Sequence, residues 1–180
     1  MRNSDRYDVR WAGVVLALML GGCGSLGGPA PEGSLSASPS VSPGPLAPSY
    51  PDVTKGNVAT AAELLAYDPV AQSAVIEPTL FLTGPDFCKT LHIKASDDRC
   101  NRDWVAEDSH VKITLPVGSQ ARLLTTRQGD EACIGTMASG GTCPVTPKQF
   151  AALARENPPL LVHVSVRNGT LTKIAQEFTP

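Results

Sequence analysis

The sequence has few aromatic residues and no excess of positive charge. Phe, Trp and Tyr make up 5% of the 180 residues, and 15 Lys and Arg stand against 17 Asp and Glu. A nucleic-acid-binding surface is typically basic, with aromatic side chains among the basic ones, and the sequence has no such stretch. We therefore expect no nucleic acid among the partners.

The start of the chain lacks an apolar run long enough to span a membrane. Trp11–Leu20 is ten residues long, whereas a membrane-spanning helix needs about 20. A short apolar run after Arg2, Arg6 and Arg10 is typical of a secretory signal peptide. Leu20-Gly21-Gly22-Cys23 follows directly, and with this motif the leader resembles that of bacterial lipoproteins, whose processing site is the lipobox.

The lipoprotein resemblance implies a signal peptide over residues 1–22 and a lipid anchor on Cys23. In that family the cysteine thiol receives a diacylglyceryl group and cleavage occurs just before the cysteine. Burial of acyl chains contributes about 0.8 kcal/mol per methylene, so two chains hold a protein durably where one holds it marginally. The resemblance thus implies an extracytoplasmic protein anchored to the cell membrane. An ordinary secretory signal with an incidental cysteine, or an uncleaved anchor, is the alternative.

The segment after Cys23 has little that could build a core. Residues 24–52 are mainly Ser, Pro, Gly and Ala with almost no charge, which predicts a disordered tether. We therefore expect a lipidated cysteine and tether over residues 23–52, and one globular domain over 53–180.

Four further cysteines predict two disulfides in an exported domain. Four cysteines allow three pairings, and we favour the two that each close a short polar segment with turn-forming residues. These are Cys88 with Cys100 and Cys133 with Cys143. A zinc site of Cys88, His92 and Cys100 is the alternative, but it lacks the close cysteine pairs of structural zinc sites. We predict no metal site and no cofactor.

The clearest secondary structure lies in the last third of the chain. Val145–Phe150 combines a capping box of Thr146 and Gln149 with Pro147 at the first helical position, and Asn157-Pro158-Pro159 ends the helix.

A β-hairpin follows this helix. Leu160–Val166 and Thr170–Phe178 flank Asn168-Gly169, which is typical of a type I′ turn. Leu171 and Ile174 cannot both face inward on a regular strand, so we expect a bulge at one of the two residues between them.

Further strands are expected upstream. Ala74–Ile76 and Ala121–Thr125 are short strands, and Val111–Val117 alternates as a half-buried strand that Pro116 ends or places at an edge. Val58–Tyr67 is ambiguous between helix and strand, with strand favoured for its second half. The fold class is mainly β (α+β): a small antiparallel sheet or partly open barrel with one short helix and two disulfides.

Turn and strand motifs extend over most of the domain. They are Tyr67-Asp68-Pro69, Val75-Ile76-Glu77, Phe81-Leu82-Thr83-Gly84, Ile113-Thr114-Leu115-Pro116-Val117, and residues 164–174. With them the domain resembles small secreted or lipid-anchored actinobacterial proteins of no established function. The resemblance implies a mainly β fold and no catalytic residues.

Searches for catalytic signatures fail. Ser109-His110-Val111-Lys112 matches the SxxK of penicillin-recognising enzymes, which needs a helix where this segment enters a predicted strand. His92, His110 and His163 lack the HExxH spacing, and we expect His163 to be a packing or surface residue.

Two loops and one tryptophan have ordinary explanations. The acidic residues near Cys100 lie beside Arg99 and Arg102 and predict a solvated, charge-balanced loop; they are Asp97, Asp98, Asp103, Glu107 and Asp108. Ser139-Gly140-Gly141 could bind an anion, but a disulfide-closed loop is favoured. Trp104 is expected in the core.

These observations predict a cell-envelope lipoprotein that displays a small non-catalytic domain for contact with an envelope protein or a small ligand. The alternative is an extracytoplasmic hydrolase, which requires a deep pocket joining a histidine to a carboxylate or serine. A purely structural role is a third possibility and requires neither a pocket nor an apolar patch.

Overall fold

The computed structural model describes residues 45–179, and the expected lipobox, Cys23 and most of the expected tether lie outside these residues. The described part contains seven strands, two α-helices and two 3₁₀ turns, and neither α-helix is long and apolar enough to cross a membrane. The elements are β1 (Asn57–Asp68), β2 (Ser73–Leu82), α1 (Gly84–Thr90), η1 (Asp98–Asn101), β3 (Val105–Asp108), β4 (Ile113–Thr125), η2 (Glu131–Cys133), β5 (Cys143–Pro144), α2 (Pro147–Glu156), β6 (Leu160–Arg167) and β7 (Thr170–Gln176).

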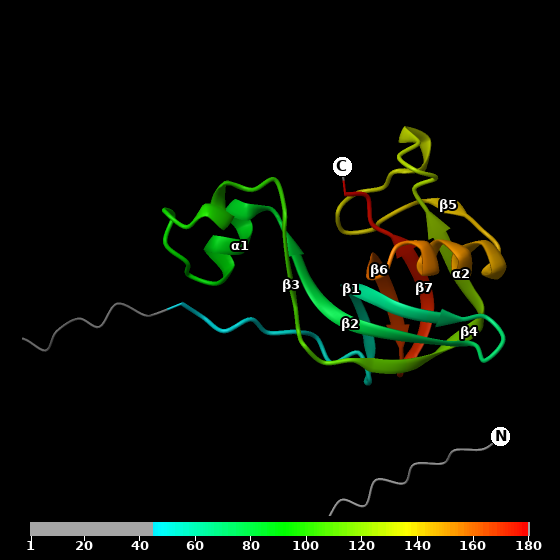
Figure 1. Cartoon of the computed structure of the whole chain (residues 1–180). Coiled ribbons are helices and arrows are strands. Elements are labelled where there is room, and N and C mark those ends of the chain that lie inside the picture. Colours follow the sequence, from blue (N-terminus) through cyan, green and yellow to red (C-terminus); the bar gives the residue numbers. More distant parts are fainter. Residues whose placement is uncertain (1–44, 180) are drawn as a thin grey trace, which may run out of the picture. The chain divides into compact units, whose positions relative to one another are not determined.

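Five strands close into a barrel (Figure 1). β1 pairs with β2 and β6, β6 pairs with β7, β7 pairs with β4, and a short β2–β4 ladder closes the ring. The β4–β7 pair is parallel and the other four are antiparallel. Along the chain the five barrel strands are β1, β2, β4, β6 and β7. Helix α2 lies between the third and fourth of these, and the third and fifth, β4 and β7, are parallel. This connectivity matches that of the OB-fold, a partly open Greek-key barrel. The predicted mainly β, partly open barrel is confirmed, and the parallel pair excludes a wholly antiparallel sheet.

The barrel interior is filled by aliphatic side chains that alternate along its strands. On β6, Val162, Val164 and Val166 are each at most 1% exposed, as a strand with one buried face requires. The same cluster includes residues of β1, β2, β4 and β7, so one core holds the whole barrel.

Helix α2 packs against β1 and β4. Phe150 is fully buried in the barrel core, and its ring meets Tyr67 edge-on with centroids 5.7 Å apart. The predicted capping box is confirmed: Thr146 accepts from the Gln149 amide, and the Gln149 side chain accepts from the Thr146 amide. Local signals therefore start a helix that the barrel core then fixes.

The predicted β6–β7 hairpin and its bulge are confirmed. Asn168 and Gly169 have φ of 48° and 75°, as a type I′ turn requires. The pairing with β6 skips Thr172, so that Leu171 and Ile174 are both fully buried.

The two strands predicted at Val111–Val117 and Ala121–Thr125 are one continuous strand, β4, so Pro116 does not end it. The alternative expectation holds locally, because at Pro116 only β2 is paired with β4. The amide of Val117 donates to the carbonyl of Gln72, the residue just before β2. The nitrogen of Pro116 faces the opposite side, where β7 pairs with β4 only from Val117 onward. The missing N–H of Pro116 therefore costs no ladder hydrogen bond.

β1 and β2 are longer than expected. Val58–Tyr67 is strand throughout, because β1 pairs with β6 over its first half and with β2 over its second. These pairings override the helix propensity of its Ala, Leu and Glu residues. The strand predicted at Ala74–Ile76 continues to Leu82.

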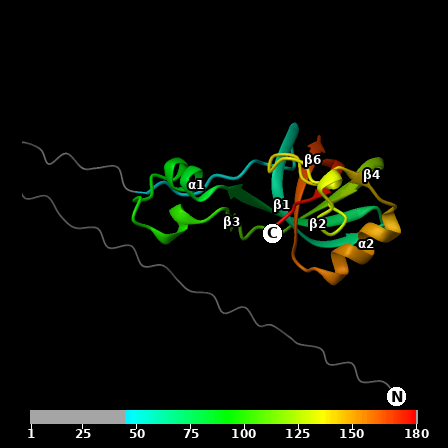
Figure 2. The ribbon, with the colours of Figure 1, turned by 90° about the horizontal axis from the view of Figure 1, so that it is seen from above.

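Residues 80–108, which we call the arm, extend away from the barrel (Figures 1 and 2). The arm consists of the end of β2, then α1, η1 and β3, and it has its own hydrophobic cluster. The cluster comprises Phe87, Cys88, Leu91, Cys100 and Val105. The predicted Cys88–Cys100 disulfide is present with Cα atoms 5.6 Å apart, so a covalent link joins α1 to η1.

Helix α1 was not predicted, although its start carries ordinary signals. Thr83 accepts from the Asp86 amide as N-cap, and Pro85 lies in the first turn. The helix depends on Gly84, because a Cβ there would overlap the backbone carbonyl oxygens of Arg99 and Arg102. The Gly84 amide also donates to the Arg102 carbonyl at 3.0 Å.

The second predicted disulfide, Cys133–Cys143, closes a loop that lies against β7. Its Cα atoms are 5.0 Å apart. The Gly141 amide donates to the Gln176 carbonyl, and Lys173 donates to the Ser139 carbonyl at 3.0 Å. Ser139-Gly140-Gly141 is thus part of a disulfide-closed loop, as favoured.

Candidate functional site

An acidic site lies where β1, β2 and β3 meet on the outer face of the sheet. Glu63 of β1 is the direct cross-strand partner of Glu77 of β2, although like charges in that position repel. Asp108, at the end of β3, pairs with Thr79 two residues further along β2. Strand pairing therefore brings together three carboxylates from distant parts of the sequence.

His110 completes the site from the turn between β3 and β4. The turn lies against β2, since the Ser109 amide donates to the Pro78 carbonyl at 2.9 Å. One ligand atom each from Glu77, Asp108 and His110 lies within 4.8 Å of the other two. Carboxylate oxygens and an imidazole nitrogen thus converge on one point.

The three side chains differ in burial. Glu77 is 5% exposed, whereas the His110 side chain is 89% exposed and that of Asp108 is 31% exposed. Oδ1 of Asp108 is itself buried, and Nδ1 of His110 lies 2.5 Å from it. The contact is an ion pair when the imidazole is protonated, and Oδ1 of Asp108 has no hydrogen-bond partner among the described residues. The site is thus open to solvent on its histidine side.

Glu77 has an unusual environment for a buried carboxylate. Among residues 45–179, no hydrogen bond or ion pair joins its carboxylate to another group. Thr79 donates to its main-chain carbonyl. A buried charge is costly unless it is paired or coordinates a metal, so this side chain lacks the partner that its burial calls for.

The electrostatic effect of the site reaches its neighbours. Burial, the charge of Asp108 and the charge of Glu77 raise the pKa of Glu63. Burial, with Glu107, Asp108 and Glu77, raises the pKa of Tyr50, whose hydroxyl donates to the Asp108 carbonyl at 2.7 Å. Burial is the larger cause of both shifts, and the smaller contributions of Asp108 and Glu77 indicate a negative potential at the site.

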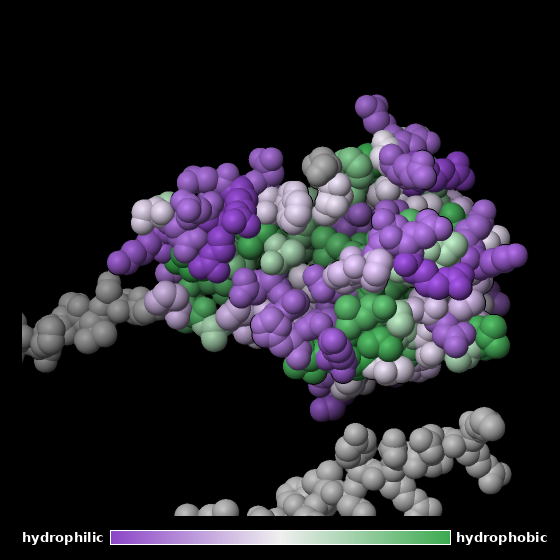
Figure 3. Space-filling model, in the orientation of Figure 1, coloured by the Kyte–Doolittle hydropathy of each residue, from purple (hydrophilic) through white to green (hydrophobic). Residues whose placement is uncertain are grey.

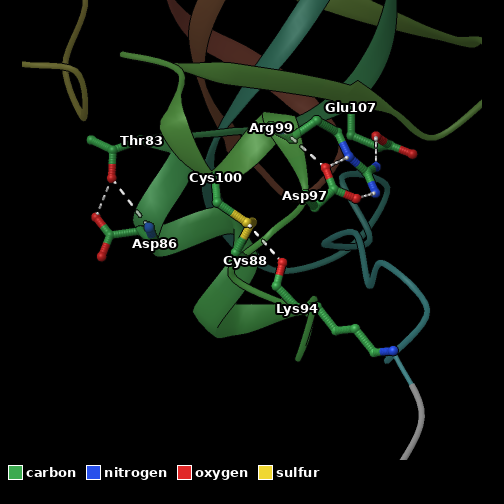
Figure 4. The surroundings of a disulfide bond; sticks show 8 residues. All are labelled: Thr83, Asp86, Cys88, Lys94, Asp97, Arg99, Cys100 and Glu107. Atoms are coloured by element: carbon green, nitrogen blue, oxygen red, sulfur yellow. Dashed lines mark hydrogen bonds and ion pairs between the residues drawn. A yellow bond between two sulfur atoms is a disulfide. The ribbon is translucent and has the colours of Figure 1, made fainter.

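The acidic residues predicted as one solvated loop fall into two groups. In the arm, Arg99 forms ion pairs with Asp97 at 3.0 Å and Glu107 at 3.9 Å, and Figure 4 shows its guanidinium between them beside the disulfide. Hydrogen bonds from Arg99 lower the pKa of Asp97 to about 2. Arg99 thus offsets part of the negative charge of this group, and no ion pair among the described residues involves Asp98 or Asp103. Asp108 belongs instead to the acidic site, with Glu77, which sequence analysis did not select.

The structure decides two further candidate sites, the zinc alternative and the SxxK match. The zinc alternative of Cys88, His92 and Cys100 is wrong because both sulfurs are in a disulfide. Ser109–Lys112 is a turn and not a helix start, and the Ser109 hydroxyl accepts from the Val111 amide.

The expectation that Trp104 is in the core is wrong. It is 36% exposed on the arm, where it packs against Phe81 with ring centroids 5.8 Å apart. The arm cluster is built instead around Phe87 and the two disulfide-bonded cysteines, and Trp104 is not a member of it.

A second titratable pair lies under the Cys133–Cys143 loop. Nε2 of His163 is 3.3 Å from Oε2 of Glu177, with side chains 12% and 5% exposed. Burial raises the pKa of Glu177 to about 7 and lowers that of His163. His163 is thus a cross-strand packing residue, as expected, with a carboxylate partner that the sequence did not indicate.

The pocket at Glu177 does not have the features that the hydrolase alternative requires. It has a volume of about 460 Å³ and is lined by Glu177 and residues of the β4–η2, α2–β6 and C-terminal segments, but not by His163. The other histidine–carboxylate pair, His110 and Asp108, does not line this pocket either. Glu177 of the His163–Glu177 pair thus lines this pocket, but neither His163 nor His110 does, so the pocket does not join a histidine to a carboxylate.

Comparisons with protein-family models, with curated proteins and with solved structures found no match for this chain.

Proposed function

We propose that this chain is a lipid-anchored protein of the bacterial cell envelope whose barrel is a non-catalytic binding module for a cationic ligand. Residues 1–22 act as the signal peptide, Cys23 carries the lipid, and the following segment is the tether. The lipobox resemblance supports the anchor. The two disulfides also support it, because such bonds persist in oxidising compartments outside the cytoplasm.

The observation that carries the binding function is Glu77, a buried residue at the acidic site whose carboxylate has no partner among residues 45–179. It is 5% exposed, and its ligand atom lies within 4.8 Å of those of Asp108 and His110. Within the described part of the chain, Arg99 forms ion pairs with Asp97 and Glu107 of the neighbouring group, whereas no Lys or Arg forms an ion pair with Glu77 or Asp108. A cation from outside the chain would supply the missing charge.

One observation favours the hydrolase alternative. Asp108 holds His110 as a carboxylate holds the histidine of a catalytic dyad. The adjacent Ser109 hydroxyl, however, forms no hydrogen bond with His110 among the described residues; it accepts one from the Val111 amide. Binding therefore has the better support.

The experiment for the anchor is the intact mass of the protein from its native membrane fraction, before and after reduction. We expect a chain that begins at Cys23, carries a diacylglyceryl group and lacks four thiol hydrogens until reduction. A Cys23→Ala variant is the control and should leave the membrane fraction or keep its leader. An unlipidated native chain would reject the anchor.

A further inference from the structure

We propose that Glu77, Asp108 and His110 form a binding site for one divalent transition-metal ion, with Zn²⁺ the best match. This inference rests on the proposed function, which makes the acidic site the binding site for a cation. It adds the identity of that cation. The three donors come from β2, β3 and the β3–β4 turn, so the site exists only when the arm is paired to the barrel strand.

The geometry suits a metal after a small movement. Zinc binds oxygen and nitrogen at about 2.0–2.1 Å, so two ligands of a tetrahedral ion lie about 3.3 Å apart. The three candidate atoms lie within 4.8 Å of one another, and the Asp108–His110 contact is 2.5 Å. An ion between them would separate that pair slightly and draw Glu77 closer. His110 can make this movement because it lies exposed in a turn.

Glu77 provides the second, independent argument. Glu77 as a residue is 5% exposed, its carboxylate has no hydrogen-bond or ion-pair partner among residues 45–179, and one carboxylate oxygen lies within 4.8 Å of the other two donor atoms. Metal coordination is one of the ways in which proteins compensate a buried charge. A metal ion would also offset the repulsion between Glu77 and its cross-strand partner Glu63.

The donor set selects the class of metal. Two carboxylates and a neutral imidazole balance the charge of a divalent ion, and imidazole suits zinc, copper, iron and nickel. Calcium takes six to eight oxygen ligands, and magnesium is bound mainly through carboxylates and water. Three protein donors leave a fourth position of a tetrahedral zinc ion open to a ligand from solution. The site therefore binds a metal that can in turn bind a partner.

The test is calorimetric titration of the purified protein, disulfides intact, with ZnCl₂. We expect one ion per chain, with affinity that increases with pH because the ligating imidazole nitrogen must be deprotonated. His110→Asn and Glu77→Gln should each weaken binding by more than the about 10–100-fold that changes around a metal site cause.

His92→Asn is the matched control. His92 and His110 are both exposed histidines with positive φ, 53° and 55°, and asparagine tolerates that conformation. We expect unchanged zinc affinity for His92→Asn. Because His110 is exposed, its variant should fold normally, so the test does not depend on whether Glu77→Gln folds.

Three results would overturn the inference: no zinc binding, zinc binding that His110→Asn does not weaken, or binding of Ca²⁺ in preference to Zn²⁺. The outcome is separable from that of the anchor. A lipidated chain that binds no zinc rejects the metal site and keeps the anchor, and a zinc-binding chain without lipid does the reverse.

Discussion

Two carboxylates of the barrel, Glu77 and Glu177, are almost equally buried, at 5% and 7% exposed, but face different groups. Glu177 lies 3.3 Å from His163, and the nearby cation Lys173 lowers its pKa while burial raises it. Glu77 faces Asp108 and His110. A proton can neutralise Glu177 in place, whereas the acidic site is arranged for an external cation. The same residue type therefore has two roles, fixed by its neighbours.

Glu177→Gln should change how stability depends on pH. Burial raises the pKa of Glu177 from 4.5 to about 7. Between these values the folded protein keeps a proton that the unfolded chain releases, so stability falls as pH rises. The lowered pKa of His163 acts in the opposite direction below pH 6.5. From pH 5 to pH 8, the variant should gain about 2 kcal/mol in unfolding free energy relative to the wild type, measured by urea denaturation.

Glu156→Gln is the matched control for this variant. Glu156 is exposed at the end of α2, so its substitution should leave the pH dependence of stability unchanged. If Glu177→Gln and Glu156→Gln show the same difference from the wild type at both pH values, the burial of Glu177 does not couple its proton to folding.

The arm and the barrel are held by different means. The barrel core draws on every barrel strand, whereas the arm has a smaller cluster around its disulfide. In Figure 3 hydrophilic residues cover much of the outer end of the arm. A small cluster of this kind usually needs a covalent link to stay folded.

Replacing both Cys88 and Cys100 with Ala should therefore loosen the arm and leave the barrel folded. In the chain-entropy model a disulfide that closes a short loop contributes on the order of 3 kcal/mol. We expect faster amide hydrogen exchange over residues 84–105 and unchanged exchange in β6 and β7. Replacing Cys133 and Cys143 is the control, because that disulfide closes a loop on β7 and not on the arm. Equal loss of protection in barrel and arm would show that they unfold as one unit.

Elements with local signals were the predictable ones. The capping box of Thr146 and the Asn168-Gly169 turn each act within a few residues, and both are present. Thr83 and Pro85 give similar signals for α1, but this helix has seven residues and needs the close approach of η1 to Gly84. The continuity of β4 through Pro116 depends on which neighbouring strand pairs there, and a single sequence does not contain that information.

The acidic site could be predicted in part. Asp108 and His110 are two residues apart, and the acidic run near them is visible in the sequence. Glu77 is 31 positions before Asp108 in the sequence (108 − 77) and reaches the site only through the pairing of β2 with β3. The cysteine pairings were predictable because each closes a short loop. A site formed by long-range strand pairing cannot be predicted from a single sequence.

At the scale of the whole molecule, the chain joins the folded domain earlier than the composition of the tether indicates. The Leu46 amide donates to the Leu91 carbonyl of the arm at 2.8 Å, and the Tyr50 hydroxyl donates to the Asp108 carbonyl at 2.7 Å. Leu46 also helps to line a pocket of about 440 Å³ with Phe87 and Leu91. Residues 45–52, assigned to the tether by composition, thus contact the arm and the acidic site.

Removing residues 23–52 should therefore weaken the arm, whereas removing residues 23–44 should not. A net hydrogen bond contributes about 1 kcal/mol, so loss of the Leu46 and Tyr50 bonds should lower the free energy of local opening of the arm by about 2 kcal/mol. Hydrogen exchange of the arm amides, measured on unlipidated chains that begin at residue 45 and at residue 53, reports this difference directly. Because the barrel core lies mainly in residues 58–174, exchange in β6 and β7 should match between the two chains. Equal exchange in their arms would mean that residues 45–52 belong to the tether alone and that the folded domain begins at Val53.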